Sequence, residues 1–407
     1  MEARVGSRGR WTTGVGALVA CALLVAGCQG SGGGTGGSGG GGGDDAAPAQ
    51  VSITPANGAK KIAPDKGVTV SVKNGKLGQV TVAESDGKGK PVSGTLAASH
   101  TSWHTDWNLK PGTSYTVTAK ATGQDDKQVT KQAKFRTVKS AETLHTAISP
   151  LDGETVGVGM PIQLLLHQKI DSEKYRKAIE RSLEVRTSKP LEGGWYWTNA
   201  NTEVDFRPKS YWPSGTKVKV TAHLTGVHAG NGLWGASDRT TSFKIGPKHV
   251  STIRNSSHEM TVKSGDKVVK KIPVSMGKPG DDTYSGTTIA QEKAAHIIMD
   301  SATTGDPGAY RIPTKWNVRM TYSGTFVHAA PWSVGSQGSA NVSHGCVNVS
   351  PSNAHWFFDF TNRGDIIKVK GTSRKLQFGN GPTPWVLSWK DWQKGSALGK
   401  PVMTKAL

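Results

Sequence analysis

The chain has 407 residues, a formal net charge of +20 at pH 7, 52 glycines and only three cysteines. At roughly 100–200 residues per domain, this length allows two to four domains, each with a core of its own. Three cysteines exclude a dense disulfide framework, so the positions of the cysteines are more informative than their number.

The N-terminal segment 1–27 has the pattern of a secretory signal. Basic residues precede a run of small and apolar residues, Gly14 to Gly27, which is too short to be read as a membrane-spanning helix. The run ends in Val25-Ala26-Gly27-Cys28, which resembles a lipobox, the site where a bacterial signal peptidase cuts before a cysteine whose thiol is acylated. The segment 18–21, which ends in Cys21, fits this pattern more loosely. Plain secretion with an unmodified Cys28 is the alternative.

Removal of residues 1–27 would leave a net charge of +18. On an exported protein this charge favours a polyanionic neighbourhood: the membrane surface, anionic wall polymers or peptidoglycan. Nucleic acid is not an expected partner, because the sequence contains no nucleic-acid-binding motif. Residues 28–50 are mostly Gly, Ser, Ala and Asp and predict a flexible tether. We therefore expect a lipid-anchored protein on the outer face of the cell membrane, facing the cell wall.

Residues 51–140 and 141–248 predict two tandem immunoglobulin-like β-sandwiches. Alternating apolar residues mark strands at 68–72, 79–82, 115–119 and 218–222. The pattern of residues 112–123 recurs at an offset of 103 residues, which matches one sandwich per repeat. Residues 172–183 form an insertion that predicts a short helix. Tryptophans in these blocks favour core packing over a carbohydrate-binding platform: Trp103, Trp107, Trp195, Trp197 and Trp212.

Residues 249–370 predict a third, mainly-β domain. Strands at 259–262 and 268–274 form a hairpin, and further strands are expected at 296–299 and 324–328. Ser350-Pro351 predicts the start of a helix, because Ser caps helix N-termini and Pro suits the first helical position. This helix is expected to stop near Arg363-Gly364. The extension 371–407 is expected to pack onto a preceding domain through its tryptophans, Trp385, Trp389 and Trp392.

Cys346 is the one thiol expected to remain free once the signal is removed. It lies in the segment 343–348, Ser-His-Gly-Cys-Val-Asn, and His328 precedes it by 18 residues at the end of a predicted strand. A nucleophilic thiol needs a base, backbone N–H groups for an oxyanion and an accessible turn; His328 or His344, Gly345 and the following helix start could supply these. The alternatives are an inert buried thiol, a zinc ligand beside His328 and His344, and an intermolecular disulfide.

Two motifs identify a family that this region resembles. Residues 322–332, Tyr-Ser-Gly-Thr-Phe-Val-His-Ala-Ala-Pro-Trp, and residues 343–350, Ser-His-Gly-Cys-Val-Asn-Val-Ser, closely resemble the signature of the L,D-transpeptidases, the cysteine peptidoglycan transpeptidases of the YkuD type. The similarity runs from Met260 to Val369. The lipoprotein signal, the two sandwiches and the Trp-rich extension also resemble the multidomain enzymes of actinobacterial type.

The resemblance implies roles for individual residues. Cys346 would be the nucleophile, His328 the general base and His344 a neighbouring support. The carbonyl of Ala329, where many relatives have Ser, would orient His328, and backbone N–H groups around Gly345 and Cys346 would hold the oxyanion. Thr304 replaces an aromatic residue that relatives often place in a lid. Substrate contacts and pocket lining are implied for Tyr310, Ser323, Gly324, Asn348, Met299 and Trp332.

The resemblance also implies the reaction. The thiolate would attack the carbonyl of the third residue of a tetrapeptide stem, release terminal D-Ala and leave a thioester. The side-chain amine of a diamino acid on a second stem would then form a 3→3 cross-link. Water as the acceptor would give an L,D-carboxypeptidase, and a silent glycan-binding lipoprotein or a zinc hydrolase are further hypotheses. No metal or organic cofactor is expected, and carbapenems are expected to acylate Cys346.

Overall fold

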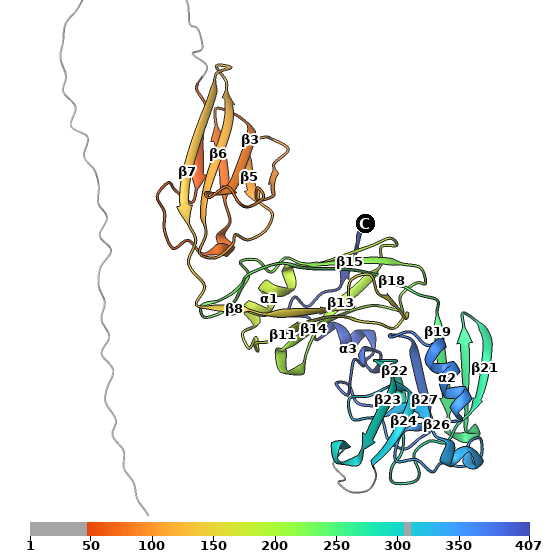
Figure 1. Ribbon diagram of the computed structural model, residues 1–407. Coiled ribbons are helices and arrows are strands. Elements are labelled where there is room, and N and C mark those ends of the chain that lie inside the picture. The colour runs from red at the N-terminus through yellow and green to blue at the C-terminus, as the bar shows by residue number, and fades with distance from the viewer. Residues whose placement is uncertain (1–46, 305–310) are drawn as a thin grey trace, which may run out of the picture. The chain divides into compact units, whose positions relative to one another are not determined.

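The computed structural model describes residues 47–304 and 311–407. The fold is mainly β with a few short helices, as the sequence predicts (Figure 1). Within the described residues, no helix is long and apolar enough to cross a membrane. The signal segment, Cys28 and Tyr310 lie outside the described residues, so their predicted roles remain predictions.

The first sandwich has two antiparallel sheets. Their strand orders are β1-β2-β5-β4 and β3-β6-β7. In β2 the alternating sequence Thr-Val-Ser-Val-Lys buries Val70 and Val72 and exposes the polar residues between them, which confirms the period-two prediction. The bounds are β1 Gln50–Thr54, β2 Thr69–Lys73, β3 Gly75–Glu84, β4 Gly94–Leu96, β5 Ser102–Thr105, β6 Ser114–Gly123 and β7 Gln128–Arg136.

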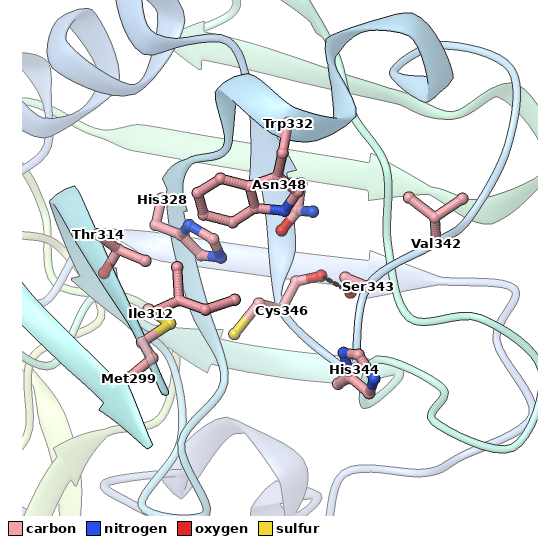
Figure 2. A pocket seen from close by; sticks show the side chains of 10 residues that line it. All are labelled: Met299, Ile312, Thr314, His328, Trp332, Val342, Ser343, His344, Cys346 and Asn348. Atoms are coloured by element: carbon pink, nitrogen blue, oxygen red, sulfur yellow. Dashed lines mark hydrogen bonds between the residues drawn. The ribbon is translucent and has the colours of Figure 1, made fainter. Parts of the chain in front are cut away.

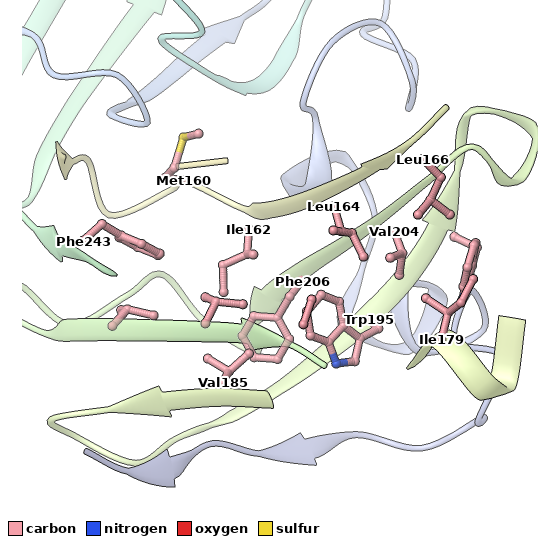
Figure 3. Packing of buried hydrophobic residues seen from close by; sticks show 14 of the residues in the cluster. Met160, Ile162, Leu164, Leu166, Ile179, Val185, Trp195, Val204, Phe206 and Phe243 are labelled. Atoms are coloured by element: carbon pink, nitrogen blue, oxygen red, sulfur yellow. The ribbon is translucent and has the colours of Figure 1, made fainter. Parts of the chain in front are cut away.

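The second sandwich packs two five-stranded sheets around a large core, part of which Figure 3 shows. Trp195, Trp212 and Phe206 are fully buried there, so core packing of these tryptophans is confirmed. Helix α1 (Glu173–Arg181) is the predicted insertion. The sheet orders are β10-β18-β15-β12-β29 and β28-β13-β14-β11-β9, with a small third sheet β16-β17-β8; β28 (Val402–Met403) and β29 (Lys405–Ala406) belong to the C-terminal extension. The bounds are β8 Glu142–Leu144, β9 Thr146–Ser149, β10 Thr155–Val156, β11 Ile162–Leu166, β12 Leu183–Thr187, β13 Glu192–Thr198, β14 Glu203–Pro208, β15 Lys217–Ala222, β16 His228–Gly230, β17 Leu233–Gly235 and β18 Arg239–Ile245.

The sequence repeat corresponds to equivalent strand pairs. The first copy falls on β6, which pairs antiparallel with β7, and the second copy falls on β15, which pairs antiparallel with β18. Phe135 of β7 and Phe243 of β18 are both buried in the cores of their sandwiches. The repeat therefore corresponds to the same kind of antiparallel strand pair in each unit.

The third region packs two sheets face to face around a core of its own. Their orders are β21-β20-β19-β27-β22 and β23-β24-β25-β26. Helix α2 (Pro351–Phe360) starts at the predicted Ser350 cap, whose hydroxyl accepts the Asn353 N–H at 3.3 Å, and ends before the expected stop near Arg363. The bounds are β19 His249–Arg254, β20 Glu259–Ser264, β21 Lys267–Pro273, β22 Gly286–Ile289, β23 Lys293–Asp300, β24 Arg311–Arg319, β25 Phe326–Ala329, β26 Val347–Val349 and β27 Ile366–Lys370.

The C-terminal extension packs onto the second sandwich, as its tryptophans predict. Strand β28 (Val402–Met403) joins the edge at β13, and β29 (Lys405–Ala406) joins the edge at β12. Helix α3 (Trp389–Gln393) lies against β13, and its Trp392 is fully buried and donates to the Gly194 carbonyl at 2.8 Å (Figure 1). The buried guanidinium of Arg207 lies over three tryptophan rings of the extension: Trp385, Trp389 and Trp392.

The second sandwich and the third region also share an interface. Ile289 and Ile366 belong to the buried core of the sandwich, although they come from strands β22 and β27. Arg363 forms two hydrogen bonds with the carboxylate of Glu154, at 2.6 and 2.7 Å. The contacts between the second sandwich and the third region are therefore both apolar and ionic.

Candidate active site

A pocket of about 310 Å³ opens over the sheet β23-β24-β25-β26. Figure 2 shows that side chains from both predicted motifs line it, together with residues of β23 and β24. The lining residues are Met299, Ile312, Thr314, His328, Trp332, Val342, Ser343, His344, Cys346 and Asn348.

A tight turn presents Cys346 to this pocket. Gly345 has φ +117°, a conformation that side-chain-bearing residues rarely adopt, and its N–H donates to the Ser343 hydroxyl at 3.1 Å. The Ser343 hydroxyl in turn donates to the Cys346 carbonyl at 2.6 Å. Ser343 therefore fixes the turn, which makes it a positioning residue that the sequence analysis did not single out.

The thiol of Cys346 is in its neutral form. Burial raises the pKa of this thiol to about 11, although the residue keeps partial access to solvent on the pocket side. The Sγ–H donates to the Gly324 carbonyl across 3.6 Å, a weak hydrogen bond. A neutral thiol needs a base that takes its proton when the sulfur attacks a carbonyl carbon.

His328 is the histidine best placed to accept that proton. It lies on β25, is 3% exposed and faces the same pocket as Cys346 (Figure 2). Its Nδ1 lies 2.9 Å from the Ala329 carbonyl, which assigns the ring proton to Nδ1 and leaves the Nε2 lone pair available. Burial lowers the pKa of His328 to about 4, so the imidazole is neutral at pH 7.

His344 occupies a different environment. It is exposed at the rim of the pocket, and its Nε2 lies 3.1 Å from the Nζ of Lys278. The sequence offered both histidines as the base. His328 is buried and its ring is oriented by a backbone carbonyl, whereas His344 is exposed at the edge of the pocket, so His328 is the better candidate.

Strand pairing explains why the two motifs meet. β25 and β26 run parallel and in register, so that His328 lies opposite Asn348, two residues beyond Cys346. The Asn348 amide is buried and donates to the Ser333 hydroxyl at 3.1 Å. Trp332, 54% exposed, and Met299 form parts of the pocket wall.

The segment Ser323-Gly324 is held by a residue of the C-terminal extension. The Asn380 side chain accepts the Ser323 N–H at 2.9 Å and donates to the Ser323 hydroxyl at the same distance. Sequence reasoning missed Asn380, because it lies 57 residues away in a stretch without periodicity. Ile312, Thr314 and Val342 were missed for a similar reason: ordinary strand and loop residues carry no motif.

Metal ligation was one of the competing hypotheses. Across residues 47–304 and 311–407, no group of three or more His, Cys, Asp or Glu side chains is arranged to hold a metal ion. His328, His344 and Cys346 therefore line one pocket without forming such a cluster.

Both parts of the chain match known protein families. Residues 248–369 match the L,D-transpeptidase catalytic domain (YkuD), and residues 59–228 match the bacterial Ig domain. The chain is 39% identical over 346 residues to L,D-transpeptidase 2 of Mycobacterium tuberculosis, covering 84% of this chain and 83% of that protein. L,D-transpeptidase 5 of the same species is 32% identical over 364 residues, covering 88% and 79%. The solved structure of LD transpeptidase LdtMt1 in complex with imipenem is 36% identical, with a TM-score of 0.48, and covers 56% of this chain and 99% of that one.

Proposed function

The chain belongs to the L,D-transpeptidase family, and from this premise we propose that it forms 3→3 cross-links between peptidoglycan stem peptides through a thioester on Cys346. The observation that carries the proposal is the placement of a neutral thiol and a neutral imidazole on one pocket wall, with the imidazole oriented by the Ala329 carbonyl.

Acylation begins with proton transfer. His328 Nε2 takes the proton from Cys346 Sγ as the sulfur attacks the carbonyl carbon of the third stem residue, and the C=O π electrons move onto oxygen. The tetrahedral intermediate then collapses and the C–N bond to terminal D-Ala breaks. An imidazolium with a pKa of about 4 is a strong acid in this setting, so it readily protonates the departing amine.

The oxyanion of the intermediate needs N–H donors. The Gly345 N–H already donates to Ser343, so we assign this role to the N–H of Cys346 itself. One such donor typically contributes a factor of about 10²–10³ to the rate. The Gly345 conformation matters because it sets the direction of this N–H.

Deacylation completes the reaction. The side-chain amine of a diamino acid on a second stem attacks the thioester, His328 accepts the amine proton and then returns a proton to the departing sulfur. The products are an amide cross-link and the regenerated thiol. Attack by water would follow the same course and release a tripeptide, which is the carboxypeptidase alternative.

The predictions made from the N-terminal segment and the two sandwiches would locate this reaction at the cell wall. Acylation of Cys28 would anchor the chain to the membrane, the Gly-rich segment would give reach, and the two sandwiches would carry the catalytic domain toward peptidoglycan. The acylation of Cys346 by carbapenems follows from the same nucleophile, since the β-lactam carbonyl is a strained amide.

A tetrapeptide assay with mass detection tests the proposal. Wild type should convert a disaccharide-tetrapeptide into a dimer that has lost one D-Ala, whereas Cys346→Ala should give none. Blocking the side-chain amine of the substrate by acetylation should abolish the dimer and leave only hydrolysis.

The two histidines provide a matched pair of variants. We expect His328→Gln to lower the acylation rate by a factor of about 10²–10⁴, the usual contribution of a general base, and His344→Gln to have a much smaller effect. Dimer formation that survives Cys346→Ala, or equal losses in both histidine variants, would overturn the assignment.

A further inference from the structure

A second concave surface lies on the sheet β21-β20-β19-β27-β22, on the face that points away from the core shared with the active-site sheet. Its cavity has a volume of about 510 Å³. We call it the basic groove. It is lined by Tyr211, Lys248, Val250, Thr252, Arg254, Thr261, Lys263, Gly265, Asp266, Lys271 and Lys368.

Strand alternation builds the groove. Ile253, Val262 and Ile367 point inward and are fully buried, so their neighbours Thr252, Thr261 and Lys368 point outward. The register places Lys368 opposite Thr252, Thr252 opposite Thr261, and Thr261 opposite Lys271. The face thus has a band of threonines between cations.

The charge of the groove is strongly one-sided. Five cationic side chains and a single carboxylate, Asp266, line it. Lys271 lies 3.4 Å from Glu259, but in the described part of the chain Lys248, Arg254, Lys263 and Lys368 form no ion pair within 4 Å. Burial lowers the pKa of Lys368, and the nearby charges of Lys370 and Lys248 lower it further. Five cations near only two carboxylates, Asp266 in the lining and Glu259 beside Lys271, create a site of net positive potential.

One wall of the groove is aromatic. Tyr211 packs edge-on against Trp385 of the C-terminal extension at 4.5 Å, and the Lys368 ammonium lies 5.6 Å from the Tyr211 ring centre. A fixed aromatic ring and threonine hydroxyls suit a sugar or polyol unit, and the flanking cations suit anionic groups attached to it.

We propose that the basic groove binds an anionic glycopolymer, a chain of sugar or polyol units that carry repeated phosphate or carboxylate groups. The favoured occupant is a polymer, because cations are distributed on four strands, β19, β20, β21 and β27, or next to them, so that several anionic groups can bind together. The active-site pocket opens on the other sheet, so a bound polymer leaves Cys346 accessible. The groove would hold the catalytic domain against the wall while stems are cross-linked. This setting rests on the proposed location, but binding can be measured without it.

Binding to a defined probe tests the groove. The full chain with Cys28→Ser, which removes the expected acylation site, is titrated with fluorescent poly(glycerol phosphate), and uncharged dextran serves as the neutral probe. We expect binding to poly(glycerol phosphate) that weakens steeply between about 50 and 200 mM NaCl, because polyanion binding releases counterions. Dextran should not bind measurably.

Charge variants locate the binding surface. Lys263→Glu with Lys368→Glu should weaken binding by about tenfold or more, and the milder Lys263→Gln with Lys368→Gln should weaken it less. Lys219→Glu with Lys244→Glu makes the same charge change on exposed strand positions of the second sandwich and should have little effect. Imipenem acylation of Cys346 should be unchanged in all of these variants, which reports on the catalytic fold and separates this inference from the proposed function.

Two results would overturn the inference. The first is equal loss of polymer binding in the groove variant and in the sandwich variant, since the effect would then be net charge alone. The second is binding to vesicles of phosphatidylglycerol and phosphatidylcholine that depends on Lys263 and Lys368 without binding to the polymer, which would make the groove a membrane contact.

Discussion

The protonation state of Cys346 gives a prediction that can be worked out numerically. Burial raises the pKa of the thiol to about 11 from an ordinary value of 9.0, and burial lowers the pKa of His328 to about 4. Both directions favour the neutral pair over a thiolate with an imidazolium. At pH 8 a thiol with a pKa of 11 is about 0.1% thiolate, against about 10% for a pKa of 9.0. Alkylation at pH 8 should therefore be about 100-fold slower than for an unperturbed cysteine.

Iodoacetamide labelling, followed on the peptide that contains Cys346, measures this directly. The rate should rise about tenfold per pH unit from pH 7 and level off only near pH 11. Because no ion pair holds the resting thiolate, His328→Gln should leave the profile nearly unchanged. A rate that is already on a plateau between pH 5 and pH 8, and that collapses in His328→Gln, would show a thiolate–imidazolium pair and refute the reasoning.

Further predictions concern the supports of the site. Gly345→Ala should lower the imipenem acylation rate about tenfold or more, because φ +117° strains an alanine by about 1–3 kcal/mol, while Gly335→Ala, in open surroundings and without positive φ, should acylate normally. Ser350→Ala removes the cap of α2 and should lower the free energy of unfolding by about 1 kcal/mol in urea titration; an unchanged midpoint would contradict the capping role. Trp392→Ala should lower that free energy by about 3–5 kcal/mol, since a fully buried indole and its hydrogen bond are lost, and a loss below that range would mean that the extension is only loosely attached.

Local sequence patterns were enough to predict much of the fold. The alternation in β2 and the Ser350-Pro351 start of α2 follow from steric and capping preferences of adjacent residues, which a sequence displays directly. The 103-residue repeat also pointed to one sandwich per repeat, and its two copies fall on β6 and β15, which form antiparallel pairs with β7 and β18.

Packing between segments that lie far apart in the chain was harder to predict from the sequence. Strands β28 and β29 have two residues each, too few for any period, and they pair with segments about two hundred residues earlier in the chain. The extension was expected to pack back because it is rich in tryptophan, yet nothing in the sequence selected Arg207 as the group that three of its indoles cover.

The residues of the candidate site also fall into two groups: those that the sequence predicted and those that only the structure revealed. His328 and Cys346 stand in motifs whose resemblance to a family placed them together, and the parallel pairing of β25 with β26 provides the physical reason. Asn380 and Ser343 act through hydrogen bonds to backbone and side-chain groups of the site, and such contacts depend on the folded geometry rather than on a residue pattern.

The mass of the acyl-enzyme tests the central claim most directly. Wild-type chain mixed with a tetrapeptide donor whose side-chain amine is acetylated, and quenched in acid, should gain the mass of the donor less D-Ala, and peptide mapping should locate the added group on Cys346. His328→Gln should accumulate this species much more slowly. A chain that releases D-Ala without any adduct on Cys346, or that carries the adduct on another residue, would contradict the account.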